Sequence, residues 1–144
     1  MKVGYIRPIA ICVCSNAGRI LVFEGYDSVK NQTFYRPLGG GIEFQEFSQQ
    51  AVVREFQEEL KVTILNPRLL GTLENIFTYM AHDGHELVFV YDGELANPEL
   101  YQQEEIIGYE DDGSPFKAMW KSLEFFQSGQ APLYPTGLLD LLLK

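Results

Sequence analysis

The segment GGIEFQEFSQQAVVREFQEELKV, which runs from Gly40 to Val62, joins a glycine turn to a densely charged stretch. Glu46 lies between the two, and the charged stretch reads Arg54-Glu55-Phe56-Gln57-Glu58-Glu59. Two carboxylates one helical turn apart repel each other by about 0.2–0.5 kcal/mol. A divalent cation that carries a phosphate chain would neutralise such a cluster. We therefore expect a cation to bind at this segment.

The segment is predicted to form a helix over residues 48–60. Ser48 is a suitable N-cap, with Phe47 before it as the apolar N′ residue. No Gly or Pro interrupts residues 48–60. At about 100° per residue, the acidic side chains of the helix fall within one arc that is about 100° wide; these are Glu55, Glu58 and Glu59.

Oxygen ligands that converge from one face of a helix favour Mg²⁺ or Mn²⁺. A solvated acidic helix face is the alternative explanation of an isolated E-x-x-E-E pattern, because such runs are common on soluble helices. The glycines, Glu46 and Arg54 at their particular spacings favour the metal site.

The spacing of these residues resembles the signature of the Nudix (MutT-like) hydrolase family. That signature is a Gly, five residues, a Glu, seven residues, Arg-Glu, an aliphatic or aromatic residue, any residue, Glu-Glu, any residue, a Gly and an apolar residue. The matching positions are Gly40, Glu46, Arg54, Glu55, Phe56, Glu58, Glu59 and Val62. Lys61 stands where the family has Gly, and Gln45 stands where many members have Gly before the first Glu.

The resemblance implies a single Nudix domain over residues 1–144, with the signature at 40–62. The implied fold is an α/β/α sandwich with a mixed β-sheet and a loop-helix-loop catalytic motif. Lys61 would then end the helix in the left-handed conformation that favours Gly. We expect that departure to lower stability and to leave catalysis intact.

The resemblance also implies roles by position. The backbone carbonyl of Gly39 would be a metal ligand, together with the helix carboxylates Glu55, Glu58 and Glu59. Arg54 would belong to the catalytic set by orienting these carboxylates through fork-like contacts. Gly40 and Glu46 would support the site structurally.

The implied chemistry is Mg²⁺- or Mn²⁺-dependent attack of water on a pyrophosphate linkage. The expected substrate is a small-molecule nucleoside di- or triphosphate derivative, above all a nucleoside diphosphate linked to another group, as in a nucleotide sugar or ADP-ribose. Three alternatives stay open: a nucleoside triphosphate pyrophosphohydrolase, a nucleotide-sensing module without catalysis, and an acidic interaction domain. The substrate itself is not readable from the sequence, because specificity lies in loop geometry.

Three candidate residues lie outside the signature. Glu110, in the acidic loop 101–114, is a candidate extra metal ligand or base, although a solvated loop is the favoured explanation of that stretch. Arg7 and Arg36 are candidate phosphate contacts, since arginine forks match phosphate oxygens. Ordinary surface ion pairs explain these two arginines equally well.

Composition limits the remaining function classes. The chain has 144 residues, 46% of them apolar, which favours one folded domain. Its net charge of −9 argues against bulk nucleic acid as a partner. No stretch approaches a membrane span. Cys12 and Cys14 are predicted to be buried thiols on one face of a strand, which fits a reducing cytoplasm. A homodimer is compatible with the sequence.

Outside the signature, local patterns predict mostly strands. The expected elements are a hairpin of 5–14 and 19–24 around 15–18, a strand 34–38 that leads into the glycine turn 39–41, a strand 62–65, a strand pair 69–80 and 86–95 joined by 81–85, a strand 116–120, a helix near 122–128 and a last helix at about 135–143. Pro135 is expected in the first turn of that last helix, and His82 and His85 are expected to be exposed.

Overall fold

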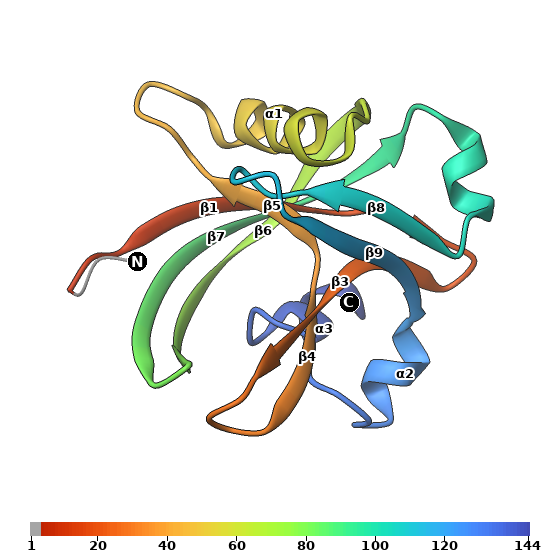
Figure 1. Ribbon diagram of the computed structural model, residues 1–144. Helices are drawn as coiled ribbons and strands as arrows, with labels where there is room; N and C mark the ends of the chain where they lie inside the picture. Colours follow the sequence, from red (N-terminus) through yellow and green to blue (C-terminus); the bar gives the residue numbers. More distant parts are fainter. Residues whose placement is uncertain (1–3) are drawn as a thin grey trace.

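The structure is a computed structural model that describes residues 4–144 (Figure 1). Its elements in chain order are β1 (Arg7–Val13), β2 (Ser15–Asn16), β3 (Arg19–Asp27), β4 (Gln32–Arg36), β5 (Leu38–Gly41), α1 (Ser48–Leu60), β6 (Ile64–Tyr79), β7 (His82–Leu95), the 3₁₀-helix η1 (Pro98–Gln102), β8 (Glu105–Tyr109), β9 (Pro115–Ser122), α2 (Leu123–Gln127) and α3 (Leu138–Leu142).

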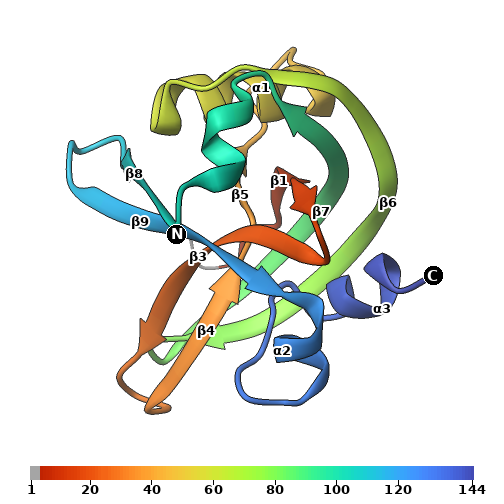
Figure 2. The ribbon, with the colours of Figure 1, turned by 90° about the vertical axis from the view of Figure 1, so that its right-hand side faces the viewer.

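Two β-sheets form the middle of the molecule. One has the strand order β5-β1-β7-β6 and is mixed, because β1 runs parallel to β7 and its other pairs are antiparallel. The other has the order β2-β3-β9-β8, with β4 paired to β3. Helix α1 covers one side of the sheets, while α2 and α3 lie on the opposite side (Figures 1 and 2). The expected α/β/α sandwich with a mixed sheet is confirmed, and the structure adds a second, antiparallel sheet to it.

Alternation along β1 builds two cores. Ala10 and Cys12 face a cluster that includes Phe56 of α1, whereas Ile9 and Ile11 face a second cluster on the side of α3. Successive side chains of a strand point to opposite faces, so a strand covered on both sides is apolar throughout. β1 is thereby packed between the two layers of helices.

The two cysteines are free and buried on the same side of the sheet, as the sequence predicts. The hydrogen bond between them, and then burial, raise the pKa of the Cys12 thiol well above its usual range. Cys12 is therefore an unreactive thiol that serves packing.

The predicted first hairpin is wrong in its pairing. The turn at Ala17-Gly18 exists, but only the two residues of β2 pair with β3 across it. β1 pairs instead with β5 and β7 in the other sheet. The chain changes sheets after Val13, and this step is invisible in the local apolar pattern.

The glycine stretch 39–41 is also different from the prediction of a turn. It belongs to β5, which runs antiparallel to β1 with Gly39 opposite Ile11 and Gly40 opposite Ala10. Glycine has a low preference for strands, so the sequence favours a turn there. Here Gly39 and Gly40 are required because β1 and α1, respectively, approach the backbone of β5 closely.

The long hairpin of β6 and β7 turns at Met80-Ala81, two residues with φ of 52° and 64°. The predicted connection at 81–85 is therefore too long, and its residues belong to β7. His82 is exposed, as expected, whereas His85 is half-buried and pairs with Ile76 of β6.

Two further elements differ from the sequence-based expectation. The acidic stretch 101–114 contains β8, which pairs with β9, so only residues 110–114 form a turn. The last helix is the short α3, and Pro135 precedes it. The expected strand 116–120 and the helix near 122–128 are confirmed as β9 and α2. Within residues 4–144, no helix has the length and apolar character needed to cross a membrane.

Candidate active site

Packing of α1 determines which of its faces is free. Ala51, Val52, Phe56 and Leu60 are buried beneath the helix, so the charged residues lie along its flank. The N-cap is Phe47, one residue before the predicted Ser48. The side chain of Gln50 accepts from the Phe47 N–H at 2.9 Å.

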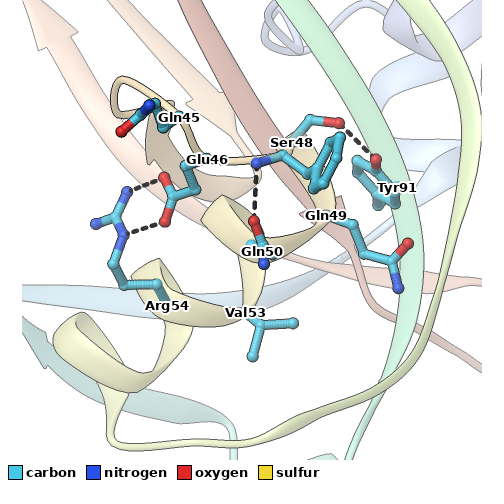
Figure 3. Close-up of a pocket in the computed structure, with 9 residues that line it drawn as sticks. Gln45, Glu46, Ser48, Gln49, Gln50, Val53, Arg54 and Tyr91 are labelled. Atoms are coloured by element: carbon cyan, nitrogen blue, oxygen red, sulfur yellow. Dashed lines mark hydrogen bonds and ion pairs between the residues drawn. The ribbon is translucent and has the colours of Figure 1, made fainter.

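The Ser48 hydroxyl is the first polar group of the helix and lies 2.6 Å from the Tyr91 hydroxyl of β7 (Figure 3). This contact ties the start of α1 to the mixed sheet. The surface hollow drawn in Figure 3 lies over this end of the helix and is lined by Gln45, Glu46, Phe47, Ser48, Gln49, Gln50, Val53, Arg54 and Tyr91.

Arg54 is the organising cation of the site. Its Nε and Nη2 donate to the two carboxylate oxygens of Glu46 at 2.8 and 2.9 Å, a bidentate fork visible in Figure 3. Nη2 also donates to the carbonyl oxygen of Gly41 at 3.0 Å. Nη1 donates to Glu55 at 3.0 Å and to Glu58 at 3.3 Å. One guanidinium thus joins the loop, β5 and two helix carboxylates.

The charges of this network support one another. The hydrogen bond from Arg54 is the main cause that lowers the pKa of Glu46 below its usual value. In turn, the hydrogen bond to Glu46 is the main cause that raises the pKa of Arg54. Glu46 also accepts the Glu43 N–H at 3.0 Å, so the same carboxylate holds the loop in shape.

Glu59 is the exception among the helix carboxylates. Its Oε1 is buried and has no hydrogen-bond partner among the described residues. Burial, and then the charge of Glu55, raise the pKa of Glu59 to about 8. A hydrogen bond with Glu55 contributes to the same rise of the pKa. A buried carboxylate oxygen without a partner, such as this Oε1, is costly unless a proton or a cation compensates it.

The glycines of β5 let the backbone reach this carboxylate group. A Cβ on Gly40 would lie 2.5 Å from Cδ of Glu55. A Cβ on Gly39 would collide with the carbonyl oxygen of Ala10, and the φ of Gly39 is 153°. Only glycine therefore allows β5 to lie between β1 and the carboxylates of α1.

A cleft of about 170 Å³ opens beside these residues, and we call it the glutamate cleft. It brings together five of the residues that the sequence suggests: Gly39, Gly40, Glu59, Arg7 and Arg36. Glu110, which directly follows β8, lines the same cleft. Burial, and then the neighbouring Asp112, raise the pKa of Glu110. Glu110 is thus the sixth of the suggested residues in the cleft, and it reaches the cleft from the antiparallel sheet.

Glu55 and Glu58 are held differently from Glu59. Both contact Arg54, and the Glu58 side chain is 47% exposed. Within residues 4–144, no three His, Cys, Asp or Glu side chains are gathered into a ready-made cation site. The residues nevertheless fit a hard divalent cation, because the donor set is all oxygen and the buried Glu59 oxygen is unpaired. The exposed Glu58 side chain has the freedom to turn toward such an ion.

A second cavity, of about 530 Å³, continues from the glutamate cleft, and we call it the inter-sheet pocket. Phe23, Arg36, Glu110 and Phe116 line both cavities. Further along, the pocket is walled by Phe34, whose ring contacts those of Tyr79 and Tyr134. Its size suits a small organic ligand.

The two positions that depart from the Nudix signature share one conformation. Lys61 has φ 58° and ψ 38°, and Gln45 has φ 67°. The expected left-handed end of α1 is confirmed, with the Val62 N–H donating to the Phe56 carbonyl oxygen at 3.3 Å. The Lys61 ammonium donates to the Glu58 carbonyl oxygen at 3.1 Å, which partly offsets the strain.

Comparison with known proteins agrees with the fold and with the signature. The NUDIX domain family matches residues 4–135. The chain therefore belongs to the Nudix family.

Similar solved structures share this fold. The MutT NUDIX hydrolase from Burkholderia pseudomallei has a TM-score of 0.68 at 19% identity, over 96% of this chain and 97% of that one. A NUDIX hydrolase from Nitrosomonas europaea has a TM-score of 0.66 at 18% identity, over 96% and 86% of the two chains. The Nudix hydrolase YvcI of Bacillus subtilis is 27% identical over 84 residues, which are 58% of this chain and 48% of that relative. The chain thus spans about half the length of this curated relative.

Proposed function

We propose that this chain, as a single Nudix domain, is a divalent-metal-dependent pyrophosphohydrolase. Its substrate would be a nucleoside diphosphate linked to another group, such as a nucleotide sugar or ADP-ribose. The observation that carries this proposal is the unpaired, buried Glu59 oxygen at the wall of the glutamate cleft. Family membership over residues 4–135 supports the reaction class.

The residues that would hold the cation, Mg²⁺ or Mn²⁺, are Glu55, Glu58, Glu59 and the backbone carbonyl of Gly39. When bound, the cation supplies Lewis-acid polarisation of the phosphoryl oxygens and lowers the pKa of a bound water. Arg54 keeps two of the carboxylates in position, and Glu46 keeps Arg54 in position. Gly40 gives the Glu55 carboxylate its space.

Arg7 and Arg36 would bind the phosphate oxygens, because both residues line the glutamate cleft together with Glu59 and Glu110. In the reaction, a water oxygen forms a bond to one phosphorus and the bridging P–O bond breaks. The bridging oxygen leaves with the second phosphate, and the water proton passes to a carboxylate of the cleft. Glu110 is a candidate for that proton acceptor or for an additional ligand, because it faces the same cleft.

Two other functions fit the same residues less well. A nucleoside triphosphate pyrophosphohydrolase would use the same carboxylates, but the 530 Å³ inter-sheet pocket offers a second organic group more room than a terminal phosphate needs. A nucleotide sensor without catalysis has no need of three helix glutamates and Arg54 together. Two free, buried cysteines fit the cytoplasmic location that we propose.

A substrate panel tests the proposal. Nucleotide sugars, ADP-ribose, dinucleotide polyphosphates and nucleoside triphosphates are incubated with Mg²⁺, with Mn²⁺ or with chelator, and the products are separated by chromatography. The proposal expects cleavage of a nucleoside diphosphate derivative into two monophosphates, and no cleavage with chelator. Metal-dependent binding without any product would favour the sensor, and preferred release of pyrophosphate from triphosphates would favour the alternative enzyme.

A further inference from the structure

A polar row crosses the mixed sheet beside the active site. Arg7 of β1 pairs with Glu86 of β7, and Glu86 pairs with Asn75 of β6. Directly opposite residues on adjacent strands share one face of the sheet. Two residues further along the strands, on the same face, the paired residues are Ile9, Val88 and Leu73. The polar row therefore lies at the edge of an apolar core.

Two members of this row hold unpaired acceptors. Asn75 is 6% exposed and Glu86 is 4% exposed, and neither Asn75 Oδ1 nor Glu86 Oε1 has a hydrogen-bond partner among the described residues. Arg7 and Arg36 lie 3.8 and 4.0 Å from the Glu86 carboxylate. These distances compensate its charge but exceed those of hydrogen bonds, so its oxygen stays available. Buried acceptors are seldom left unpaired in a native protein without a cause.

The position of the row indicates what that cause is. Asn75 lines the inter-sheet pocket, Arg7 lines the glutamate cleft, and Arg36 lines both, whereas Glu86 lies behind them and lines neither cavity. The row therefore runs under the junction where a diphosphate in the cleft would meet the group that extends into the pocket. Sequence reasoning did not single out Asn75 or Glu86, because only the strand register places them at this junction.

We propose that Asn75 Oδ1 accepts a hydrogen bond from the organic group attached to the substrate diphosphate, and that this residue, beside which Glu86 lies on the neighbouring strand, determines which substrates are accepted. An amide oxygen can only accept, so the ligand must offer O–H or N–H donors. Ribose hydroxyls, an amino or imino edge of a base, and hydroxyls of the second group all have this chemistry. The inference rests on the proposed function, because it takes the glutamate cleft as the diphosphate site.

The experiment measures discrimination between matched substrates. It uses the panel compound with the highest kcat/KM and three counterparts of it: one without the nucleoside 2′-hydroxyl, one whose base lacks exocyclic amino groups and ring N–H, and one whose second group is a methyl. Wild-type protein is expected to lose at least about tenfold in kcat/KM with one counterpart, because that counterpart leaves the buried Asn75 acceptor unpaired. The counterpart that shows the loss identifies the source of the donor.

The decisive variant is Asn75→Leu, which keeps the size of the side chain and removes its polar group. We expect KM for the parent compound to rise about tenfold, kcat to change little, and the discrimination against the sensitive counterpart to disappear. Glu86→Gln, which places an amide at the same position, is expected to reduce the same discrimination. Thr72→Val, an exposed position of the same strand, is the control that should retain wild-type values.

The thermal stability of the variants separates recognition from structural support. Asn75→Leu removes an amide whose buried Oδ1 is unpaired, so its melting temperature should equal or exceed that of wild type. An equal loss of kcat/KM with all four compounds, or no loss with any, would overturn the inference. If no compound is cleaved with either metal, the proposed activity fails by itself. The same comparison is then made by equilibrium binding, where an absence of discrimination would again overturn the inference.

Discussion

Single residues at this site are constrained by contacts that their neighbours in sequence do not reveal. Gly40 is required by the Glu55 carboxylate, which lies where a Cβ would project. Lys61 and Gln45 occupy the left-handed region without being glycine. The space at Gly40 affects the position of a catalytic carboxylate, whereas the backbone conformation at Lys61 and Gln45 affects stability. Substitutions at these positions can therefore separate effects on turnover from effects on stability.

Gly40→Ala should fold normally and lose activity. The added methyl meets the far end of a flexible side chain, so the Glu55 carboxylate can move aside at little cost in stability. Because catalytic groups displaced by about 1 Å can lower turnover about a hundredfold, we expect kcat to fall by that order. Steady-state kinetics of the purified variant measure the expected loss of kcat, and thermal denaturation measures whether the variant folds normally. Normal kcat in a folded variant would show that the Glu55 position is not critical.

Lys61→Gly should stabilise the protein. A non-glycine residue in the left-handed region costs about 1–2 kcal/mol, and the greater freedom of glycine in the unfolded chain returns about 0.4–1 kcal/mol of that. We expect the free energy of unfolding to rise by about 0.5–1 kcal/mol in urea denaturation. Turnover should stay near the wild-type value, and a large change in it would assign Lys61 a role in the reaction.

At the scale of elements, α1 was predictable to within one residue at its N-cap, whereas several of the strands that surround it were not. Residues 48–60 carry an uninterrupted amphipathic pattern, and their neighbours in sequence determine the helix. β5 could not be predicted, because its glycines have no strand preference and are selected by close contact with Ala10 and Glu55. β8 lies in a stretch that reads as a solvated acidic loop, and only its pairing with β9 makes it a strand.

The residues of the candidate site also fall into those that the local sequence predicts and those that only the fold brings together. The signature residues of the loop and helix could be predicted because their spacing is local. That Arg7, Arg36 and Glu110 line one cleft depends on strands from both sheets meeting there. Asn75 and Glu86 could not be found from the sequence, because their significance lies in strand register and in the absence of a partner.

Asp27 joins two hairpins and gives a pH-dependent prediction. Burial raises its pKa, but N–H groups of Lys30, Met80 and Val29 donate to its carboxylate and together lower the pKa below the usual value of 3.8. A lowered native pKa means that the stabilisation is present above pH 3.8 and is lost as the pH falls through the native pKa.

Asp27→Asn should therefore melt at a lower temperature than wild type at neutral pH. The difference between the two proteins should shrink progressively as the pH falls below 3.8. Thermal denaturation of both proteins across this range provides the measurement, with Asp83→Asn, at an exposed position in the same region, as the charge-matched control. A constant difference at all pH values would indicate that the carboxylate charge is not what stabilises the turn.

At the scale of the whole molecule, the acidic wall of the glutamate cleft adds to a net charge of −9. A divalent cation that binds only the folded state should stabilise it, by about 2.7 kcal/mol at a hundred times its dissociation constant. We expect Mg²⁺ to raise the melting temperature of wild type relative to chelator. Glu55→Gln should lose most of that increase, while Glu74→Gln, an exposed glutamate of β6, should keep it. An equal increase in both variants would place the bound cation elsewhere.

The most direct test of the proposed activity compares turnover of Glu59→Gln and Glu74→Gln with that of wild type in Mg²⁺, on the best substrate of the panel. The two variants make the same change from carboxylate to amide, but of the two residues only Glu59 has a buried, unpaired oxygen at the cleft. We predict that Glu59→Gln lowers kcat by about a hundredfold or more, the size expected when charge stabilisation of the transition state is lost. Glu74→Gln should match wild type. Wild-type turnover by a folded Glu59→Gln variant would contradict the proposal.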